Sequence, residues 1–416
     1  MKNNTSPSNI KESFCPKCGT RVQSRFLITN NFLYLQRRCG NHIKENEVLH
    51  KIDEILPHYI WNSNIKNLMD RENPWKGTKA VDVLITRKCH WKCKVCYIKY
   101  GRENYEEMSI DNFKKILKVL NGAKVVLNGG EVTLRNDLED FIKLTLESGN
   151  IPVVYTNGLR FSSRSYVKKL KRAGLKEVVI TFDGFKGEIY EKLRSGKHEL
   201  KLVMKALENL KKENVKTSIY STIVKGINDD QIPYILRYMA SNKFIWTVSF
   251  KPVYLPGASK TLRLTEENIP SYSELIELIG REVKGITTSY ILQLRKLLES
   301  IQYSFANSSN PIYFTWLEVP TIFVKRKGNK LKPLFPQSLL SLILPYVKKL
   351  NRVATLPSIF SHNSEGIFKL EEYLFRRGIG KIVLGTIAPN VSPYISSAPT
   401  LKQLKGRVIL SSYLAW

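Results

Sequence analysis

Apolar and polar positions follow two different periods along the chain from about residue 80 onward. Short β-branched runs predict strands at 81–86, 124–128, 151–156, 177–182, 216–224 and 246–253. Segments with helical spacing lie between them and predict helices at 109–120, 136–149, 163–174, 200–215 and 229–241. Ser109 and Asn136 are expected to begin the first two helices, and Gly149 is expected to end the second.

Repeated strand–helix alternation is typical of a parallel sheet with right-handed crossovers. Six such units predict an α/β fold, a partial (β/α)6 barrel whose chemistry lies at the carboxyl ends of the strands. The stretch "TRKCHWKCKVCYIKYG" (86–101) follows the first predicted strand. We therefore expect Cys89, Cys93 and Cys96 to lie in a loop over that end of the sheet.

The regular alternation of strand and helix patterns ends at about residue 256, and an α+β C-terminal region is expected after it. The pattern predicts helices at 271–283 and 290–301, and strands within 311–334 with a turn at Gly328. Segment 338–352 has apolar residues at helical spacing with basic residues nearby: Leu339, Leu342, Ile343, Tyr346 and Leu350, with Lys348, Lys349 and Arg352. Such a stripe either lies on an anionic membrane or packs into the core, and packing is the commoner fate.

The N-terminal region carries the other three cysteines in two short knuckles. Cys15 and Cys18 form one pair, and Cys39 with His42 forms the second after 20 intervening residues. This spacing predicts a small ribbon that holds one tetrahedral ion, with zinc as the default and iron as the alternative. Residues 26–38 are expected to form a hairpin across an Asn-Asn turn that joins the two knuckles.

The charge balance is strongly positive, with 66 Lys and Arg against 36 Asp and Glu, a net charge of +30. Such an excess of positive charge indicates the kind of partner and not the fold. Suitable partners are an anionic membrane face, a phosphorylated substrate or nucleic acid. The Gly-aromatic motifs of RNA-binding domains are absent from the sequence, so no nucleic acid is expected. The polar N-terminus resembles no secretory signal, and no stretch has the apolar length of a transmembrane segment.

The three cysteines of the loop have three and then two residues between them. A cubane iron–sulfur cluster normally takes four thiolates, so this loop leaves one iron open to a chelating ligand. A ferredoxin-type cluster needs a fourth cysteine, but the only other cysteines belong to the ribbon. Three purely structural thiols are the remaining alternative, and a loop this polar disfavours it.

The arrangement C-x-x-x-C-x-x-C after the first strand resembles the signature of the radical SAM superfamily. "NGGEV" (128–132), "TNG" (156–158), "TFDG" (181–184) and "SFKPV" (249–253) follow at the ends of later strands, where that fold would place them. The resemblance implies a [4Fe–4S] cluster on Cys89, Cys93 and Cys96, with S-adenosylmethionine on the fourth iron and an electron donor such as ferredoxin. It also implies S-adenosylmethionine contacts from nine residues: Gly129, Gly130, Glu131, Asn157, Thr181, Asp183, Arg194, Thr222 and Pro252.

From the residues alone, two of these contacts have plain alternatives. Arg194 suits a carboxylate because a guanidinium binds one in bidentate fashion, but arginines at helix ends are mostly exposed. Asp183 stands before Gly184 and suits a turn equally well.

The ribbon, together with "TFDGF", "KGINDDQIPYI" and "SFKPVYLPG", looks like the archaeal tetraether lipid synthase branch of that superfamily. This resemblance implies reductive cleavage of S-adenosylmethionine to a 5′-deoxyadenosyl radical, which abstracts a hydrogen from an ether lipid at the membrane surface. The chain has no cysteine after Cys96, unlike the lipid-joining enzymes with auxiliary clusters, so a head-group reaction such as calditol attachment fits better. The alternatives are a peptide- or cofactor-maturing enzyme with an acidic partner, and a non-catalytic zinc-ribbon binding protein.

The expected organisation has four parts: a polar tail at 1–14, the ribbon and linker at 15–75, the radical SAM core at 78–256 and a C-terminal substrate or membrane-proximal region at 257–416. A cytoplasmic location is expected, with peripheral contact to the inner membrane face if the substrate is a lipid.

Overall fold

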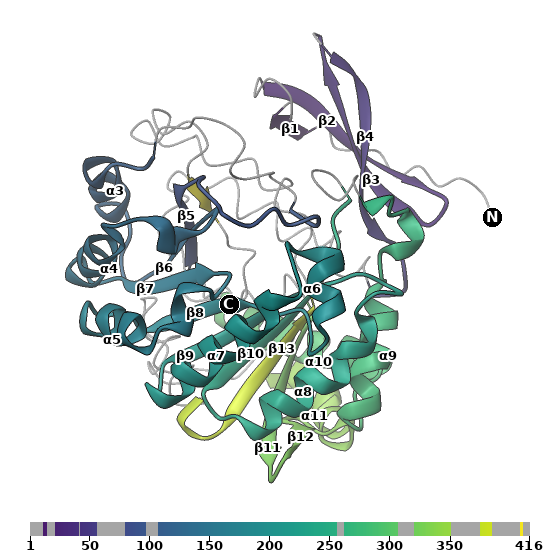
Figure 1. Ribbon diagram of the computed structural model, residues 1–416. Helices are drawn as coiled ribbons and strands as arrows, with labels where there is room; N and C mark the ends of the chain where they lie inside the picture. The colour runs from purple at the N-terminus through teal and green to yellow at the C-terminus, as the bar shows by residue number, and fades with distance from the viewer. Residues whose placement is uncertain are drawn as a thin grey trace.

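The computed structural model describes residues 11–14, 21–40, 42–55, 80–96, 107–255, 262–306, 320–350, 375–384 and 408–410. Figure 1 shows a small N-terminal sheet beside a large sheet flanked by helices. The large sheet has the strand order β12-β11-β13-β10-β9-β8-β7-β6-β5-β14. Within the described residues, no helix has the length and apolar character needed to cross a bilayer.

Six consecutive parallel strands form the centre of the large sheet, as predicted. They are β5 (Ala80–Thr86), β6 (Lys124–Gly129), β7 (Ile151–Thr156), β8 (Glu177–Thr181), β9 (Lys216–Ile223) and β10 (Ile245–Pro252). Each predicted strand matches one of them to within two residues at either end. Most side chains on both faces are buried, which explains the largely apolar, β-branched composition of the strands.

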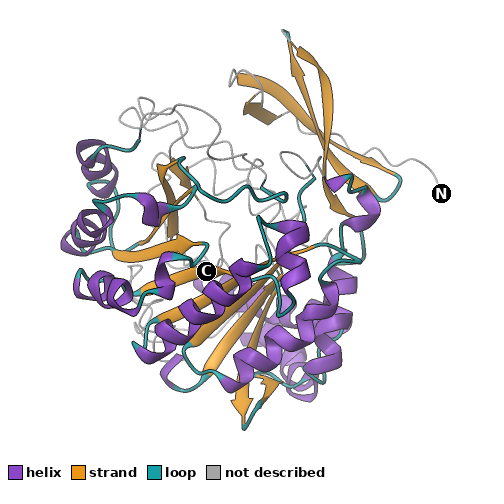
Figure 2. Cartoon of the chain, viewed as in Figure 1, coloured by secondary structure: helices purple, strands orange, loops and turns teal. Residues whose placement is uncertain are grey.

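The connecting helices pack along one face of this sheet (Figure 2). They are α3 (Ile110–Leu117), α4 (Leu138–Glu147), α5 (Arg164–Arg172), α6 (Gly187–Leu193), α7 (His198–Lys212) and α8 (Ile232–Ser241). Ser109 caps α3 as predicted, accepting a hydrogen bond from the Asn112 amide. Asn136 does not begin α4, because the N-cap position falls on Asp137, whose carboxylate pairs with Arg135 at 2.6 Å.

The C-terminal region extends both edges of the sheet, which the sequence did not indicate. β13 (Ile379–Leu384) pairs parallel to β10, β11 (Thr321–Lys327) pairs antiparallel to β13, and β14 (Val408–Leu410) pairs antiparallel to β5. β12 (Lys330–Pro333) follows β11 across a turn at Gly328, as predicted. α9 (Tyr272–Glu282) and α10 (Thr288–Ala306) match the two predicted helices.

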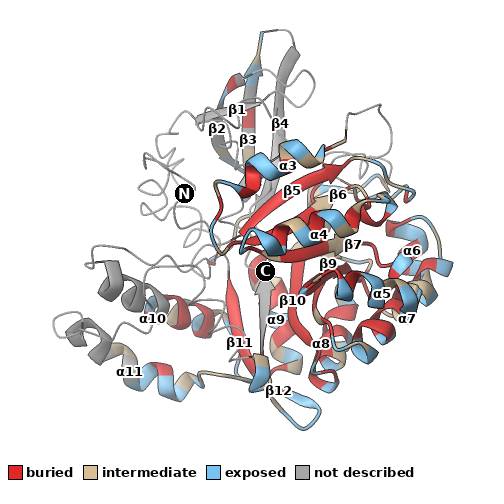
Figure 3. Cartoon of the chain, turned by 90° about the vertical axis from the view of Figure 1, so that its left-hand side faces the viewer, coloured by how far each residue is buried: buried red, intermediate tan, exposed pale blue. Residues whose placement is uncertain are grey.

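Segment 338–352 does form a helix, α11 (Gln337–Leu350), and the two residues of the predicted stripe whose burial the structure describes are exposed. Leu339 is 37% exposed and Leu342 is 65% exposed, whereas Leu340 is fully buried. Leu340 is not part of the predicted stripe. Figure 3 shows exposed positions on α11 beside the buried strands of the large sheet.

The N-terminal sheet has four antiparallel strands in the order β1-β2-β3-β4. They are β1 (Lys11–Phe14), β2 (Arg21–Thr29), β3 (Phe32–Cys39) and β4 (His42–Lys51). The predicted hairpin is β2–β3, and Asn30 and Asn31 form its turn with φ values of 50° and 61°. Asparagine tolerates this left-handed conformation better than most residues, so the Asn-Asn pair fixes the turn.

Candidate active site

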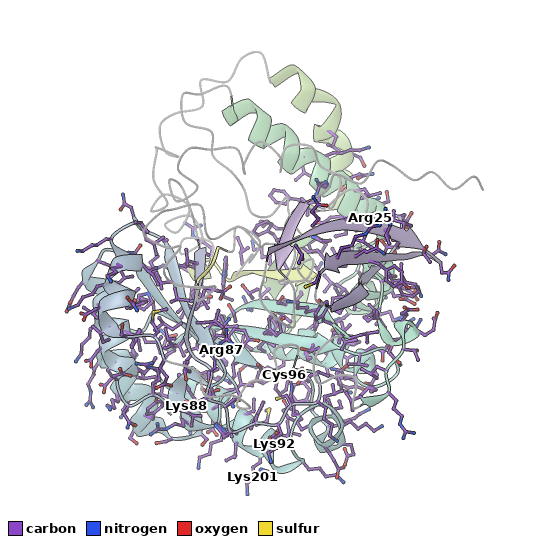
Figure 4. The ribbon with its side chains drawn as sticks, turned by 90° about the horizontal axis from the view of Figure 1, so that it is seen from above. Arg25, Arg87, Lys88, Lys92, Cys96 and Lys201 are labelled. Atoms are coloured by element: carbon purple, nitrogen blue, oxygen red, sulfur yellow. The ribbon has the colours of Figure 1, made fainter. Side chains whose placement is uncertain are left out.

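The cysteine loop begins where β5 ends at Thr86, over the carboxyl ends of the parallel strands. Its backbone is held against the end of α6: the Lys94 amide donates to the Leu193 carbonyl at 2.9 Å, and the Lys92 amide donates to Ser195 Oγ at 2.7 Å. Figure 4 shows Arg87, Lys88 and Lys92 on the same side of the molecule as Cys96. The fold therefore places the three cysteines where the sequence predicted them.

All three loop cysteines are free thiols and are partly buried. Burial raises the pKa of Cys93 to about 11, although the neighbouring Arg194 guanidinium acts in the opposite direction. Burial also raises the pKa of Cys89 to about 12, and the charges of Cys93 and Cys96 contribute to that shift. The thiols are thus close enough to influence one another electrostatically.

The donor set of the loop suits an iron–sulfur cluster. Cys89, Cys93 and Cys96 are free thiols on one loop, and cluster irons are bound by cysteine thiolates. Within the described parts of the chain, no three His, Cys, Asp or Glu side chains form a site for a single metal ion.

The two glycines of the second motif lie against the backbone of the cysteine loop. A Cβ atom on Gly129 would lie 2.0 Å from the Thr86 carbonyl oxygen, and one on Gly130 would lie 2.2 Å from the Lys88 carbonyl oxygen. The side of each glycine where a Cβ would project therefore faces the cysteine loop. The Gly130 amide also donates to Thr86 O at 3.0 Å, so this turn buttresses the loop.

The Glu131 side chain organises the strand ends from a fully buried position. Its Oε1 accepts hydrogen bonds from the Thr133 amide at 3.1 Å, the Thr133 hydroxyl at 2.5 Å and the Thr156 hydroxyl at 2.8 Å. Its Oε2 accepts from the Asn157 amide at 2.8 Å. The carboxylate thus ties the end of β6 to the end of β7, which brings "NGGEV" and "TNG" together.

Asp183 and Arg194 form a buried bidentate ion pair beside the loop. Arg194 Nε donates to Asp183 Oδ2 at 2.6 Å, and its Nη2 donates to Oδ1 at 3.0 Å. Asp183 is fully buried and Arg194 is 8% exposed, so the exposed-arginine alternative is wrong. Thr222 completes the group, because its amide donates to Asp183 Oδ1 at 3.0 Å.

The other predicted contacts lie along the same edge of the sheet. Asn157 follows β7, and its Nδ2 lies 3.5 Å from His90 Nε2 of the cysteine loop. Thr181 ends β8 and is hydrogen-bonded to Tyr155. Pro252 ends β10, paired in register with Ile223 of β9.

Comparison with known proteins agrees with this geometry. Residues 83–239 match the sequence profile of the radical SAM superfamily. This segment of the chain is similar to radical SAM enzymes. The match begins in β5 and ends in α8, so the matched segment contains the cysteine loop and the Asp183–Arg194 pair.

Among curated proteins, the chain is 27% identical over 64% of its length to 7,8-dihydro-6-hydroxymethylpterin dimethyltransferase of Methanocaldococcus jannaschii, covering 57% of that protein. It is 32% identical over 40% of its length to GTP 3′,8-cyclase of Helicobacter pylori, covering 53% of that protein. The chain thus spans little more than half the length of either relative. Among solved structures, SuiB of Streptococcus suis bound to S-adenosylmethionine aligns with 14% identity and a TM-score of 0.41, covering 65% of this chain and 69% of SuiB.

The predicted ribbon site lies largely outside the described residues. Cys15, Cys18 and the side chain of His42 are not described. Cys39 ends β3, and its backbone is the register partner of His42 at the start of β4. The tetrahedral zinc or iron site therefore stays a prediction.

A set of polar residues on the inner face of the sheet was missed. We call the face turned away from the helices the inner face, and it carries the small apolar cluster of Val126, Val153 and Val179. Polar side chains share this face: Asp82, Asn128, Tyr155, Tyr220 and Lys251. Their signal in the sequence is a polar residue interrupting an otherwise apolar strand, as in "VDV" (81–83) or "FKP" (250–252).

Proposed function

We propose that this chain is a radical SAM enzyme that holds a [4Fe–4S] cluster on Cys89, Cys93 and Cys96 and S-adenosylmethionine on the fourth iron. Together these groups supply reductive cleavage of the sulfonium to a 5′-deoxyadenosyl radical, which abstracts a substrate hydrogen. The observation that carries this proposal is the position of three partly buried, free thiols in one loop over the strand ends, within the segment that matches the radical SAM superfamily.

The chain's own residues would bind and orient the cofactors. The backbone at Gly129, Gly130 and Glu131 would receive the methionine amine, while the buried Asp183–Arg194 pair would face the ribose and the carboxylate. A guanidinium has five N–H donors, more than the bidentate pair with Asp183 uses. Asn157, Thr181, Thr222 and Pro252 would complete the S-adenosylmethionine site along the same edge.

For the substrate we propose an archaeal ether lipid, modified at its head group as in calditol attachment or along its hydrocarbon chain. The exposed leucines of α11, Leu339 and Leu342, support contact with a membrane surface, as does the net charge of +30. Both features suit peripheral association with an anionic inner membrane face. Vesicle flotation tests this: binding to anionic ether-lipid vesicles at low salt, weakened by Leu342→Ser, is expected, and no binding at all would contradict it.

A cofactor-maturing enzyme is the second candidate, favoured by the relatives. Their names specify a pterin and a nucleotide as substrates. Release of 5′-deoxyadenosine that is stimulated by a pterin but not by an ether lipid would favour this candidate.

The electron donor is proposed to be an acidic one-electron carrier such as a ferredoxin. Lys88, Lys92 and Lys94 are exposed on the cysteine loop itself, next to the proposed cluster. Opposite charges on two proteins accelerate their encounter, and salt screens the effect. We expect the rate of cluster reduction by a ferredoxin to fall steeply with ionic strength, and a salt-independent rate would contradict this docking surface.

The test of the proposed function is anaerobic reconstitution with iron and sulfide, followed by reduction with dithionite in the presence of S-adenosylmethionine. A brown protein that forms methionine and 5′-deoxyadenosine is expected, and Cys93→Ala should abolish the reaction. A colourless protein without cleavage would instead support a non-catalytic binding protein.

A further inference from the structure

The backbone of the cysteine loop holds Cys93 opposite Arg194. The residues on either side of Cys93 are hydrogen-bonded to the residues on either side of Arg194. Two contacts join these neighbours: the Lys92 amide donates to Ser195 Oγ at 2.7 Å, and the Lys94 amide donates to the Leu193 carbonyl at 2.9 Å. The middle residue of the cysteine loop and the arginine therefore face one another across a short antiparallel contact.

The Arg194 side chain is fixed in place by its buried partners. Its contacts with Asp183, at 2.6 Å and 3.0 Å, use Nε and Nη2, and Nη2 also lies 3.4 Å from Thr222 Oγ1. The Thr222 amide holds the same carboxylate from the other side at 3.0 Å. Because Asp183 is fully buried and Arg194 nearly so, the position of this positive charge beside the loop is set by the fold and not by solvent.

The guanidinium acts on the Cys93 sulfur as well as on Asp183. Its charge and a hydrogen bond from it both lower the pKa of the Cys93 thiol, against the effect of burial. A guanidinium has five N–H donors, and the contacts with Asp183 and Thr222 engage only Nε and Nη2. Donors therefore remain for a sulfur atom.

A donor of this kind changes the redox properties of an iron–sulfur cluster. Reduction adds one electron to a cluster whose ligands are already negative thiolates. The potential depends on the net charge around the cluster, on hydrogen bonds to its sulfur atoms and on solvent exposure. A buried cation that donates to one ligating sulfur stabilises the more negative, reduced form and so raises the potential.

We propose that Arg194, held in place by Asp183, donates a hydrogen bond to the Cys93 thiolate and thereby sets the reduction potential of the cluster. This proposal rests on the proposed function, because it requires a [4Fe–4S] cluster on the three loop cysteines. It goes beyond that function, since an arginine that served only the carboxylate of S-adenosylmethionine would have no effect on the cluster before that compound binds.

The experiment measures the midpoint potential of the reconstituted full-length protein in the absence of S-adenosylmethionine. The protein is titrated with dithionite in the presence of redox mediators, and electron paramagnetic resonance follows the reduced cluster. The variants are Arg194→Gln, Arg194→Lys and Asp183→Asn. Iron content and melting curves establish that each variant is folded and loaded.

Two further variants are matched controls for the loss of a positive charge. Lys92→Met removes an exposed charge from the cysteine loop itself, and Lys205→Met removes one from the exposed side of α7. Water and salt screen both charges, so Lys92→Met should shift the potential less than Arg194→Gln does, and Lys205→Met should leave it unchanged.

We expect Arg194→Gln to lower the equilibrium constant for one-electron reduction about 10-fold or more, which is a fall of about 59 mV in the potential. Arg194→Lys keeps the charge and should lose less. Asp183→Asn removes a negative charge from the same buried group, so its potential should rise.

A potential of Arg194→Gln equal to that of the wild type would overturn the proposal, as would an equal fall in Lys92→Met. If Arg194→Gln takes up no iron, the other two variants decide: wild-type potentials in both Arg194→Lys and Asp183→Asn would also overturn it. Weaker S-adenosylmethionine binding by Arg194→Gln with an unchanged potential would assign the guanidinium to that compound alone.

Release of 5′-deoxyadenosine by the wild-type protein under dithionite tests the proposed function separately. A protein that cleaves S-adenosylmethionine, but whose potential is indifferent to Arg194, would remove this inference and leave the radical chemistry intact. A wild-type protein that forms no [4Fe–4S] cluster would remove both.

Discussion

Replacing Lys251 with methionine should make the protein more stable at neutral pH. The pKa of Lys251 falls from the ordinary 10.5 to about 8 in the folded protein. The folded state therefore holds the proton less tightly than the unfolded chain does, so the charged lysine destabilises the fold at pH 7. At about 1.36 kcal/mol for each factor of ten in proton affinity, this cost is about 3 kcal/mol.

The measured gain should be smaller than that cost, because methionine also loses the contact with the Tyr220 ring, worth about 0.5–1 kcal/mol. We expect urea denaturation at pH 7 to show Lys251→Met more stable than the wild type by about 1–3 kcal/mol. Between pH 8 and 10.5 the unfolded lysine is protonated while the folded one is largely neutral, so wild-type stability rises with pH. The advantage of the variant should therefore shrink by about 1 kcal/mol between pH 7 and pH 9.

All other titratable groups are present in both proteins. The difference in unfolding free energy between the wild type and Lys251→Met therefore reports the titration of Lys251. Lys205→Met should show no such pH dependence. A less stable Lys251→Met variant at pH 7, or a difference that does not change with pH, would refute the view that this lysine is retained at a cost to stability.

Three further substitutions test the support around the cysteine loop. Gly130→Ala places a Cβ 2.2 Å from the Lys88 carbonyl oxygen, so we expect a loss of about 2 kcal/mol in unfolding free energy and a lower iron content, whereas Gly187→Ala, with no neighbour closer than 3.5 Å, should retain both. Glu131→Gln removes a carboxylate that accepts four hydrogen bonds, and denaturant titration should show a loss of about 1–3 kcal/mol. Arg194→Lys loses the bidentate geometry, so calorimetry should show about 10-fold weaker S-adenosylmethionine binding, and unchanged binding would contradict a role for the guanidinium.

The central sheet could be predicted from sequence because its strands follow the simplest pattern available. Each of the six is a short β-branched run followed by a helix of clear period, and neighbouring strands are consecutive in the chain. β13 and β14 lack both features, because they join the sheet edges from the far end of the chain. Pairing over such separations depends on tertiary packing, which local periodicity does not encode.

The candidate site also has some features that could be predicted from the sequence and others that could not. The cysteine spacing predicted the loop, since three thiols so close in sequence must be close in space. The sequence singled out the two glycines but did not indicate that they lie against the cysteine loop, because it does not show on which side of a turn the close neighbour lies. Lys251 was missed because the sequence shows it only as one polar residue in an apolar strand. The structure adds that it is largely buried and that the charge of Asp82, five strands away in the sheet, affects its pKa.

The most direct test of the central claim is electron paramagnetic resonance of the reduced, reconstituted protein with and without S-adenosylmethionine. If Cys89, Cys93 and Cys96 leave one iron open, adding the compound should change the g-values of a [4Fe–4S] signal, and Cys93→Ala should lose that signal. A spectrum indifferent to S-adenosylmethionine, or a fourth protein ligand on the cluster, would contradict the account.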